Sequence, residues 1–191
     1  GDGGECSTNL PDHPTQPYTT LHNPTQLYTT LNNTIMKYFL AIIGGGPAGY
    51  TAAEIASKAG KDVVIFEQTA LGGTCLNVGC IPTKTLLYSA KQYYNATHAD
   101  KYGVKAEGVS FDYAKIVQRK MKVVRKLVAG IKQKLNNEHC TVVMGTAEVI
   151  SRTEETVVIK CGEEQYEAEN LLICTGSTNF VPPIPGIQDN P

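Results

Sequence analysis

The sequence has almost no net charge and lacks long apolar segments. Its 191 residues contain 17 Lys and Arg and 18 Asp and Glu, a formal net charge of −1 at pH 7. A balanced charge gives no general attraction to nucleic acid or to an anionic membrane surface. Apolar runs such as residues 38–43 are far shorter than the roughly 20 residues that cross a bilayer, and the N-terminus lacks a basic region followed by an apolar signal core. We therefore expect a cytoplasmic protein that binds small molecules and proteins, and neither nucleic acid nor a membrane.

The cysteines are too few for the disulfide scaffold of a small secreted protein, because the chain has only six. Two of them, Cys75 and Cys80, lie five residues apart in a glycine-rich segment. On a regular helix such a step rises about 7.5 Å and turns about 140°, whereas the Cα atoms of a disulfide lie roughly 4.4–6.8 Å apart. The two thiols can therefore join only if the backbone departs from a helix, which Gly79 facilitates. Pro82 suits the first turn of a following helix.

Two other interpretations of this cysteine pair are structural thiols and half of a metal site. A thiolate metal site usually shows a second ligand pair at close spacing, and none follows in the sequence. We therefore expect a redox centre and no metal. The remaining cysteines are expected to be small apolar residues or free thiols; they are Cys6, Cys140, Cys161 and Cys174.

A second motif begins where the apolar run at 38–43 ends. That run predicts a buried parallel strand, and the next six residues match the pattern G-x-G-x-x-G. A helix is expected over 47–59, with its small residues Ala48, Ala52, Ala56 and Ala59 on one side and Gly60 at its end. A second strand at 62–66 then leads to Glu67, about 20 residues past the glycines, where a carboxylate can accept both hydroxyls of an adenosine ribose. The motif in this setting predicts a dinucleotide site, with the pyrophosphate at the helix N-terminus.

The remainder of the chain alternates between helical and strand patterns. Helices are expected over 83–94 and 113–136, and the second carries a basic face that we expect to be solvated. Strands are expected at 141–144, 148–150, 156–161, 165–168 and 171–174, the middle ones forming a β-meander. Residues 1–35 contain a two-copy repeat and no period of two or 3.6, which predicts a disordered leader or a non-native extension before Met36.

The run GGTCLNVGCIPTK at residues 72–84 resembles the disulfide motif of the flavin-dependent pyridine-nucleotide disulfide oxidoreductases, and its last four residues are most similar to the dihydrolipoyl dehydrogenases among them. The resemblance implies a redox-active disulfide between Cys75 and Cys80. Cys75 would exchange with a substrate dithiol, Cys80 would lie against the flavin, and Lys84 would approach the flavin's reactive nitrogen. A lysine one turn from a thiolate at a helix N-terminus also stabilises that thiolate.

The same resemblance implies a Rossmann-like α/β domain that binds FAD over residues 36–180, with a parallel sheet and a β-meander. Residues 181–191 would begin a linker to a nicotinamide domain that these 191 residues do not include, so the domain is incomplete relative to the family. The residues expected to bind FAD are Gly44, Gly46, Pro47, Ala48, Gly49, Glu67, Gly73, Thr74, Lys84, Ala147, Thr175, Gly176 and Ser177.

The resemblance also implies a reaction. The intact enzyme would be a homodimer that oxidises dihydrolipoyl groups of 2-oxoacid dehydrogenase or glycine-cleavage complexes, passing electrons through the disulfide and FAD to NAD. We expect this chain alone to be inactive. Two alternatives stay open: an enzyme like glutathione or mercuric reductase, and a module that binds FAD or ADP without turnover. Visible flavin absorbance that a dithiol bleaches would separate the last alternative from the others.

Overall fold

Two apolar strands, β1 (Lys37–Ile43) and β2 (Val63–Glu67), lie at the centre of the computed structural model, which describes residues 37–187. The predicted leader, with Met36, lies outside the described residues. Every residue of β2 is buried, as expected for a parallel strand covered on both faces. Both strands match the predicted ones to within a residue at each end.

The sheet has the order β3-β2-β1-β6-β5-β4, in which β3 (Cys140–Met144), β2, β1 and β6 (Glu164–Ile173) are parallel. Strands β4 (Ala147–Arg152) and β5 (Val157–Cys161) continue it antiparallel as the predicted meander. The expected break between 168 and 171 is wrong. Residues 164–168 pair with β5 and residues 167–173 pair with β1, so one continuous strand serves both neighbours.

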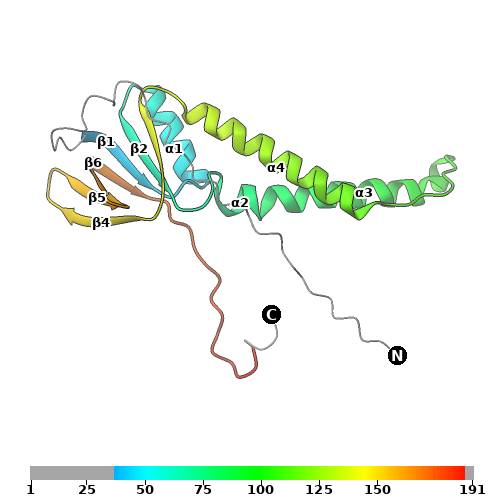
Figure 1. The fold of residues 1–191 in the computed structure, drawn as a ribbon. Helices are drawn as coiled ribbons and strands as arrows, with labels where there is room; N and C mark the ends of the chain where they lie inside the picture. The colour runs from blue at the N-terminus through cyan, green and yellow to red at the C-terminus, as the bar shows by residue number, and fades with distance from the viewer. Residues whose placement is uncertain (1–36, 188–191) are drawn as a thin grey trace.

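Helices α1 (Pro47–Lys58) and α4 (Tyr113–Leu135) cover one face of the sheet (Figure 1). Their buried residues pack against Ile42 and Ile65. On α1 the buried line is Gly49, Ala53 and Ser57, which is a rotation of about one residue from the predicted alanine line. Of the predicted alanines, Ala52 and Ala56 do pack against the core, whereas Ala48 and Ala59 are exposed. The rotation follows from the close contact between Gly49 and the backbone of Gly44.

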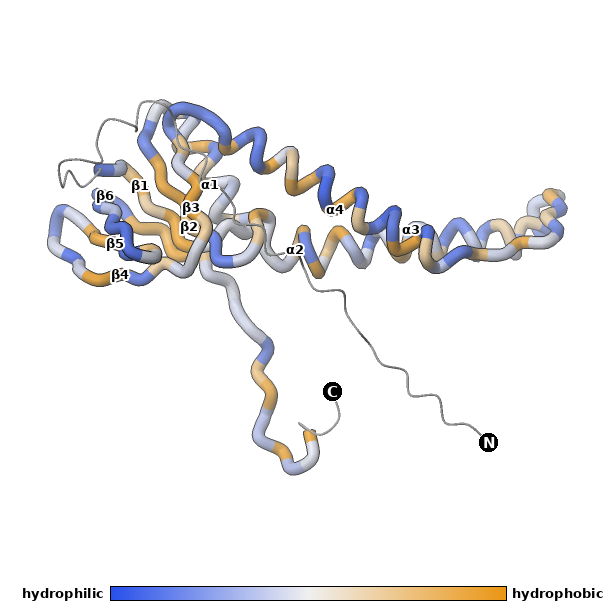
Figure 2. The backbone as a smooth tube through the Cα atoms, viewed as in Figure 1, coloured by the Kyte–Doolittle hydropathy of each residue, from blue (hydrophilic) through white to orange (hydrophobic). Residues whose placement is uncertain are grey.

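The meander covers the opposite face. Phe66 of β2 and Tyr166 of β6 meet edge to face across β1, with ring centroids 5.1 Å apart. Val157 and Ile159 of β5 belong to the same buried cluster, so the antiparallel end of the sheet curls back beneath its parallel half. Figure 2 shows apolar residues concentrated in the central strands.

Two helices extend from the sheet as a hairpin, in which α3 (Cys80–Thr97) and α4 lie side by side (Figure 1). The short α2 (Gly73–Asn77) precedes α3, and a 3₁₀ turn, η2 (Ala99–Tyr102), follows it. Helix α3 is longer at both ends than the sequence predicted. Arg119 of α4 donates to the Thr85 carbonyl at 3.4 Å and lies over the ring of Tyr88, which ties the hairpin together.

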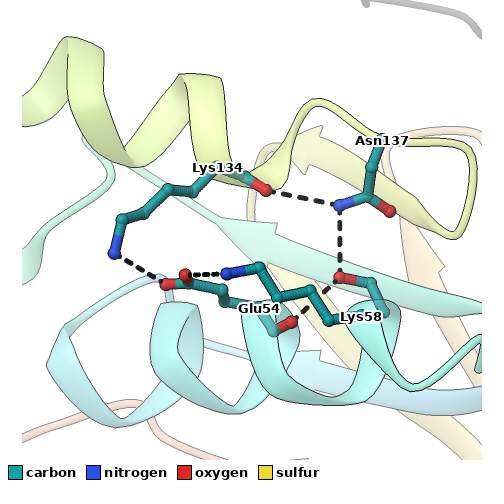
Figure 3. A network of polar contacts seen from close by, with 5 residues as sticks. Glu54, Lys58, Lys134 and Asn137 are labelled. Atoms are coloured by element: carbon teal, nitrogen blue, oxygen red, sulfur yellow. Dashed lines mark hydrogen bonds and ion pairs between the residues drawn. The ribbon is translucent and has the colours of Figure 1, made fainter.

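The basic side of α4 also reaches α1. Glu54 accepts hydrogen bonds from Lys58 at 2.7 Å and from Lys134 of α4 at 3.0 Å (Figure 3). Lys58 and Lys134 hold the pKa of the Glu54 carboxyl below its usual value. Asn137 donates to Ser57 at 3.2 Å beside them. Arg119 and Lys134 stay exposed, as expected for a solvated basic face, although each also contacts a neighbouring helix. Over residues 37–187, no helix is both long and apolar enough to cross a membrane.

Candidate functional site

The carboxyl ends of the parallel strands meet at one edge of the sheet, where open α/β sheets bind their ligands. Backbone hydrogen bonds join the turns there. Gly44 donates to the Phe66 carbonyl at 2.8 Å, Cys174 donates to the Ile43 carbonyl at 2.7 Å, and Gly145 donates to the Glu67 carbonyl at 2.8 Å. These bonds bring four separate segments of the chain to one place.

The glycines of the first turn have different roles. A Cβ at Gly49 would lie 1.8 Å from the Gly44 carbonyl oxygen, and a Cβ at Gly44, which has φ +108°, would lie 2.2 Å from the Cys174 carbonyl oxygen. The fold itself therefore excludes side chains at these two positions. At Gly46, φ is −72° and the nearest atom to an added Cβ is 3.9 Å away. Gly46 is not required by packing, and its missing side chain leaves space for a ligand.

Helix α1 starts at this turn without a protein cap. Gly46 at the N-cap makes no side-chain hydrogen bond to the helix, and the first turn has no acidic residue. A helix N-terminus presents N–H groups that have no partner within the helix, together with the positive end of the helix dipole. The start of α1 is therefore built to receive an anion such as a phosphate.

Glu67 at the end of β2 is buried and held in place by the chain. Its Oε2 accepts the Gly45 N–H at 2.8 Å, and its Oε1 accepts the Thr69 N–H at 2.8 Å, the Thr69 hydroxyl at 3.0 Å and the Ala70 N–H at 3.3 Å. Four donors fix the carboxylate beside the glycine turn, and Oε2 keeps room for another donor.

A pocket of about 1160 Å³ lies at this edge of the sheet. It is larger than the roughly 300–1,000 Å³ of most small-molecule sites, so it suits an extended ligand. The structure brings nine of the predicted FAD-binding residues into its lining: Gly44, Gly46, Glu67, Gly73, Thr74, Ala147, Thr175, Gly176 and Ser177. Pro47 and Ala48 are exposed at the start of α1, and Gly49 is buried beneath the turn, so these three lie outside the lining.

Several lining residues were not predicted from the sequence. They are Ile43, Phe66, Gln68, Thr69, Ala70, Asn77, Val78, Lys120, Met121, Val124, Arg125, Gly145, Thr146 and Cys174. Five of them directly adjoin predicted residues along the chain, which is a signal that sequence reasoning could have used: Ile43, Phe66, Gln68, Thr146 and Cys174. The four from α4 had no such signal, because nothing in a helical pattern tells which turn of the helix passes over a pocket.

Cys75 and Cys80 form a disulfide with their Cα atoms 4.7 Å apart. The backbone departs from a helix between them, as expected: α2 ends at Asn77, and Gly79 has φ −112° and ψ −106° before α3 begins. A Cβ at Gly79 would lie 3.0 Å from the Thr74 carbonyl oxygen, so a small residue suits this crossing. A bond between the two sulfurs agrees with the expected disulfide and not with the two alternatives, structural thiols and half of a metal site.

The disulfide lies next to the pocket. Thr74, which precedes Cys75, and Val78, which lies between the two cysteines in the sequence, line the pocket, while the cysteines themselves lie just outside its lining. Cys75 is half-buried and Cys80 is exposed. Lys84, one turn after Cys80 on α3, is exposed and outside the lining, so its expected role beside a flavin stays a prediction.

The other described cysteines are free thiols, as expected. Burial raises the pKa of Cys140 to about 11, and burial together with Glu164 raises the pKa of Cys161. Both thiols stay protonated at neutral pH, which makes them poor nucleophiles. Cys6 lies outside the described residues.

Comparison with known proteins supports the same chemistry. The family model described as pyridine nucleotide-disulphide oxidoreductase matches residues 38–191. Dihydrolipoyl dehydrogenase of Bacillus subtilis is 44% identical over 140 residues, which is 72% of this chain and 31% of that protein. Dihydrolipoyl dehydrogenase of Acholeplasma laidlawii is 41% identical over 154 residues, which is 80% of this chain and 45% of that protein. The chain thus spans less than half the length of these relatives.

A solved structure shares the fold. The Cu(II) complex of the HOCl-induced flavoprotein disulfide reductase RclA from Escherichia coli matches with a TM-score of 0.63 and 35% identity. The match covers 82% of this chain and 32% of that protein. The similarity confirms the expected Rossmann-like α/β fold of a flavoprotein.

Proposed function

Because this chain belongs to the pyridine nucleotide-disulphide oxidoreductase family, whose members are flavoenzymes, we propose that it is the FAD-binding and disulfide-bearing part of a dihydrolipoyl dehydrogenase. The observation that carries the proposal is the Cys75–Cys80 disulfide beside a pocket large enough for a dinucleotide. A dinucleotide pocket alone would fit many oxidoreductases, and the adjacent disulfide restricts the reaction to exchange with thiols.

The residues that line the pocket have the chemistry to hold each part of FAD. The start of α1 and the open space at Gly46 would receive the diphosphate, and the fixed carboxylate of Glu67 would accept the ribose hydroxyls. Ala147 and the segment from Thr175 to Ser177 also line the pocket, where the first would face the adenine and the second would close over the flavin nucleotide. When bound, FAD would accept two electrons from the reduced cysteine pair and pass them to NAD.

The cysteines would carry out two exchange steps. A thiolate of the substrate dithiol attacks Cys75 Sγ, which forms a mixed disulfide, breaks the Cys75–Cys80 bond and releases Cys80 as a thiolate. The second substrate thiolate then attacks the substrate sulfur of the mixed disulfide. This step closes the substrate disulfide and releases the Cys75 thiolate. Two electrons have moved from the substrate to the cysteine pair, and two substrate protons have been released. Cys80, which is exposed in this chain, would lie against the flavin, with Lys84 one turn away stabilising its thiolate.

The substrates and partners follow from the proposed reaction. They would be dihydrolipoyl groups of 2-oxoacid dehydrogenase or glycine-cleavage complexes in the cytoplasm, and the longer protein would act as a homodimer. Neither described histidine lines the pocket: His139 pairs with Asp62 at 2.9 Å, and His98 stacks on Tyr94. A general base contributes about 10²–10⁴-fold to such a reaction, so we expect the chain by itself to form no NADH at a measurable rate.

Flavin spectroscopy tests the proposal. The chain is loaded with FAD and titrated with dihydrolipoamide without oxygen, and visible flavin absorbance is followed. We expect bleaching in the unmodified chain and none in Cys80→Ser, which should bind FAD equally well. Bound FAD that dihydrolipoamide never bleaches would favour a binding module without turnover. Faster bleaching by reduced glutathione would favour a glutathione-reductase-like enzyme.

A further inference from the structure

Helix α4 forms a wall of the pocket that neither the glycine motif nor the family motif accounts for. Lys120, Met121, Val124 and Arg125 line the pocket from this helix. Residues 120 and 124, and residues 121 and 125, are each one turn apart, so one face of α4 is directed at the pocket. Val124 also packs into the core beneath the sheet edge. The two cations therefore sit on a helix that the core holds against the site.

The positive charge on this wall has no partner within the described chain. Among residues 37–187, Lys120 and Arg125 take part in no ion pair, whereas Lys115 and Lys134 of the same helix pair with Asp112 and Glu54. Glu67 is the only acidic residue in the pocket lining, and four donors of the chain already hold its carboxylate. The pocket thus presents two positive side chains that the protein itself does not neutralise.

The charge of the expected ligand is larger than the glycine turn can offset. A diphosphate diester carries two negative charges at neutral pH, whereas a helix N-terminus is equivalent to roughly half a positive charge. No side chain of the turn from Gly44 to Gly49 is charged. Arg and Lys are the side chains that bind phosphate oxygens most strongly, Arg through two parallel N–H donors and Lys as a point charge.

We propose that Lys120 and Arg125 of α4 bind the diphosphate of the adenine dinucleotide together with the N-terminus of α1. This inference rests on the proposed FAD site and adds two binding residues to it from an element outside the dinucleotide motif. Helix α4 is anchored at its far end by Ile131 and Leu135, both buried. The position of α4 against the sheet therefore fixes where Lys120 and Arg125 lie relative to the glycine turn.

The test compares two double variants of the whole chain. Lys120→Gln with Arg125→Gln removes the pocket cations. Lys122→Gln with Lys126→Gln is the matched control, since both lysines are exposed on the same helix, lie outside the lining and carry the same charge. Dissociation constants for FAD, ADP and adenosine are measured by titration calorimetry, and thermal melting shows that each variant is folded.

We expect the pocket variant to bind FAD and ADP about tenfold or more weakly, because two charge-assisted hydrogen bonds are lost. Adenosine, which has no phosphate, should bind within about twofold of the unmodified chain, and the control should bind all three ligands within about twofold. Raising the ionic strength should weaken ADP binding to the unmodified chain more than to the pocket variant.

Four results would overturn the inference, and the last of them would overturn the proposed function as well. Equal losses in the pocket and control variants would mean a general charge effect. An equal loss for adenosine and ADP would mean that the side chains contact the base and not the phosphates. Unchanged binding of FAD and ADP in the pocket variant would remove both residues from the site while leaving the proposed function intact. A chain that binds neither FAD nor ADP before mutation would instead overturn the proposed function and this inference together.

Discussion

Replacing Gly46 and Gly49 separately with Ala should separate ligand binding from folding within one turn. At Gly49 the new methyl would lie 1.8 Å from the Gly44 carbonyl oxygen and 3.3 Å from Ile42 Cγ2. Overpacking typically costs about 1–3 kcal/mol, and a clash with backbone belongs at or above the upper end. Helix propensity returns at most about 1 kcal/mol. Gly49→Ala should therefore lose at least about 2 kcal/mol of stability, a drop in Tm of roughly 4–8 °C.

At Gly46 the same methyl meets no protein atom closer than 3.9 Å, and φ of −72° suits any residue. Loss of freedom in the unfolded chain stabilises Ala over Gly by about 0.4–1 kcal/mol. Ala is a poorer N-cap than Gly by a similar amount, so the two effects nearly cancel. The methyl would, however, project into the space proposed for the diphosphate. Gly46→Ala should keep its stability within about 0.5 kcal/mol and bind ADP at least about tenfold more weakly, a loss of roughly 1.4 kcal/mol.

Urea unfolding followed by circular dichroism measures the stabilities, and titration calorimetry measures the ADP affinities. The reasoning would be refuted by a Gly46→Ala chain that binds ADP as well as the unmodified chain. It would be refuted equally if Gly46→Ala lost as much stability as Gly49→Ala. The first result would mean that the diphosphate does not occupy the space at Gly46, and the second would mean that packing does require a glycine there.

Two further predictions concern the cysteines. The Cys75–Cys80 bond closes a loop of only a few residues, so its reduction should cost about 2 kcal/mol of stability and lower the Tm by roughly 4–8 °C. If the double variant Cys75→Ser, Cys80→Ser showed the same drop in Tm on adding reductant, another disulfide would be the cause of the drop. Burial raises the pKa of Cys140 from 9.0 to about 11, so the unfolded thiol ionises first, and its contribution to stability is complete below about pH 9 and lost by about pH 11. Cys140→Ala should flatten that part of the alkaline stability curve, and an unchanged slope would contradict this assignment.

The parts of the fold and site that could be predicted from the sequence are those that depend on neighbours along the chain. A short apolar run before three glycines specifies β1 and the turn to α1, and a second run places Glu67 at a strand end. Parallel pairing then brings both strand ends to one edge without further information. The spacing of Cys75 and Cys80 likewise predicted the broken helix between them.

The parts that could not be predicted depend on contacts between distant elements. In the sequence, Lys120 and Arg125 cannot be told from Lys122 and Lys126, because the amphipathic pattern reports only which face of the helix is apolar. Which turn passes over the pocket depends on how far α4 extends along the sheet. The same limit explains the rotation of α1, since the contact of Gly49 with the Gly44 backbone, and not the alanine pattern, decides which side is buried.

The position of α4 against α1 therefore determines whether Lys120 and Arg125 line the pocket. Two kinds of contact could hold α4 in that position: buried apolar contacts and ion pairs. Leu135 lies in the core with only 1% of its surface exposed. Leu→Ala changes at such sites cost about 2–5 kcal/mol of stability. Leu135→Ala should therefore lower the Tm by roughly 4–20 °C and weaken ADP binding.

The ion pairs of Glu54 with Lys58 and Lys134 lie at the surface, where water and salt screen them, so Glu54→Gln should leave the Tm at neutral pH nearly unchanged. Lys58 and Lys134 lower the pKa of Glu54 in the folded chain, so its small contribution is present above about pH 4.5 and is lost as the pH falls further, and the small difference between the two chains should disappear in acid. Thermal melts at neutral and acidic pH, with ADP titrations at neutral pH, measure both effects. A Glu54→Gln chain that loses as much stability at neutral pH as Leu135→Ala would mean that the ion pairs, and not the apolar contact, hold α4 over the pocket.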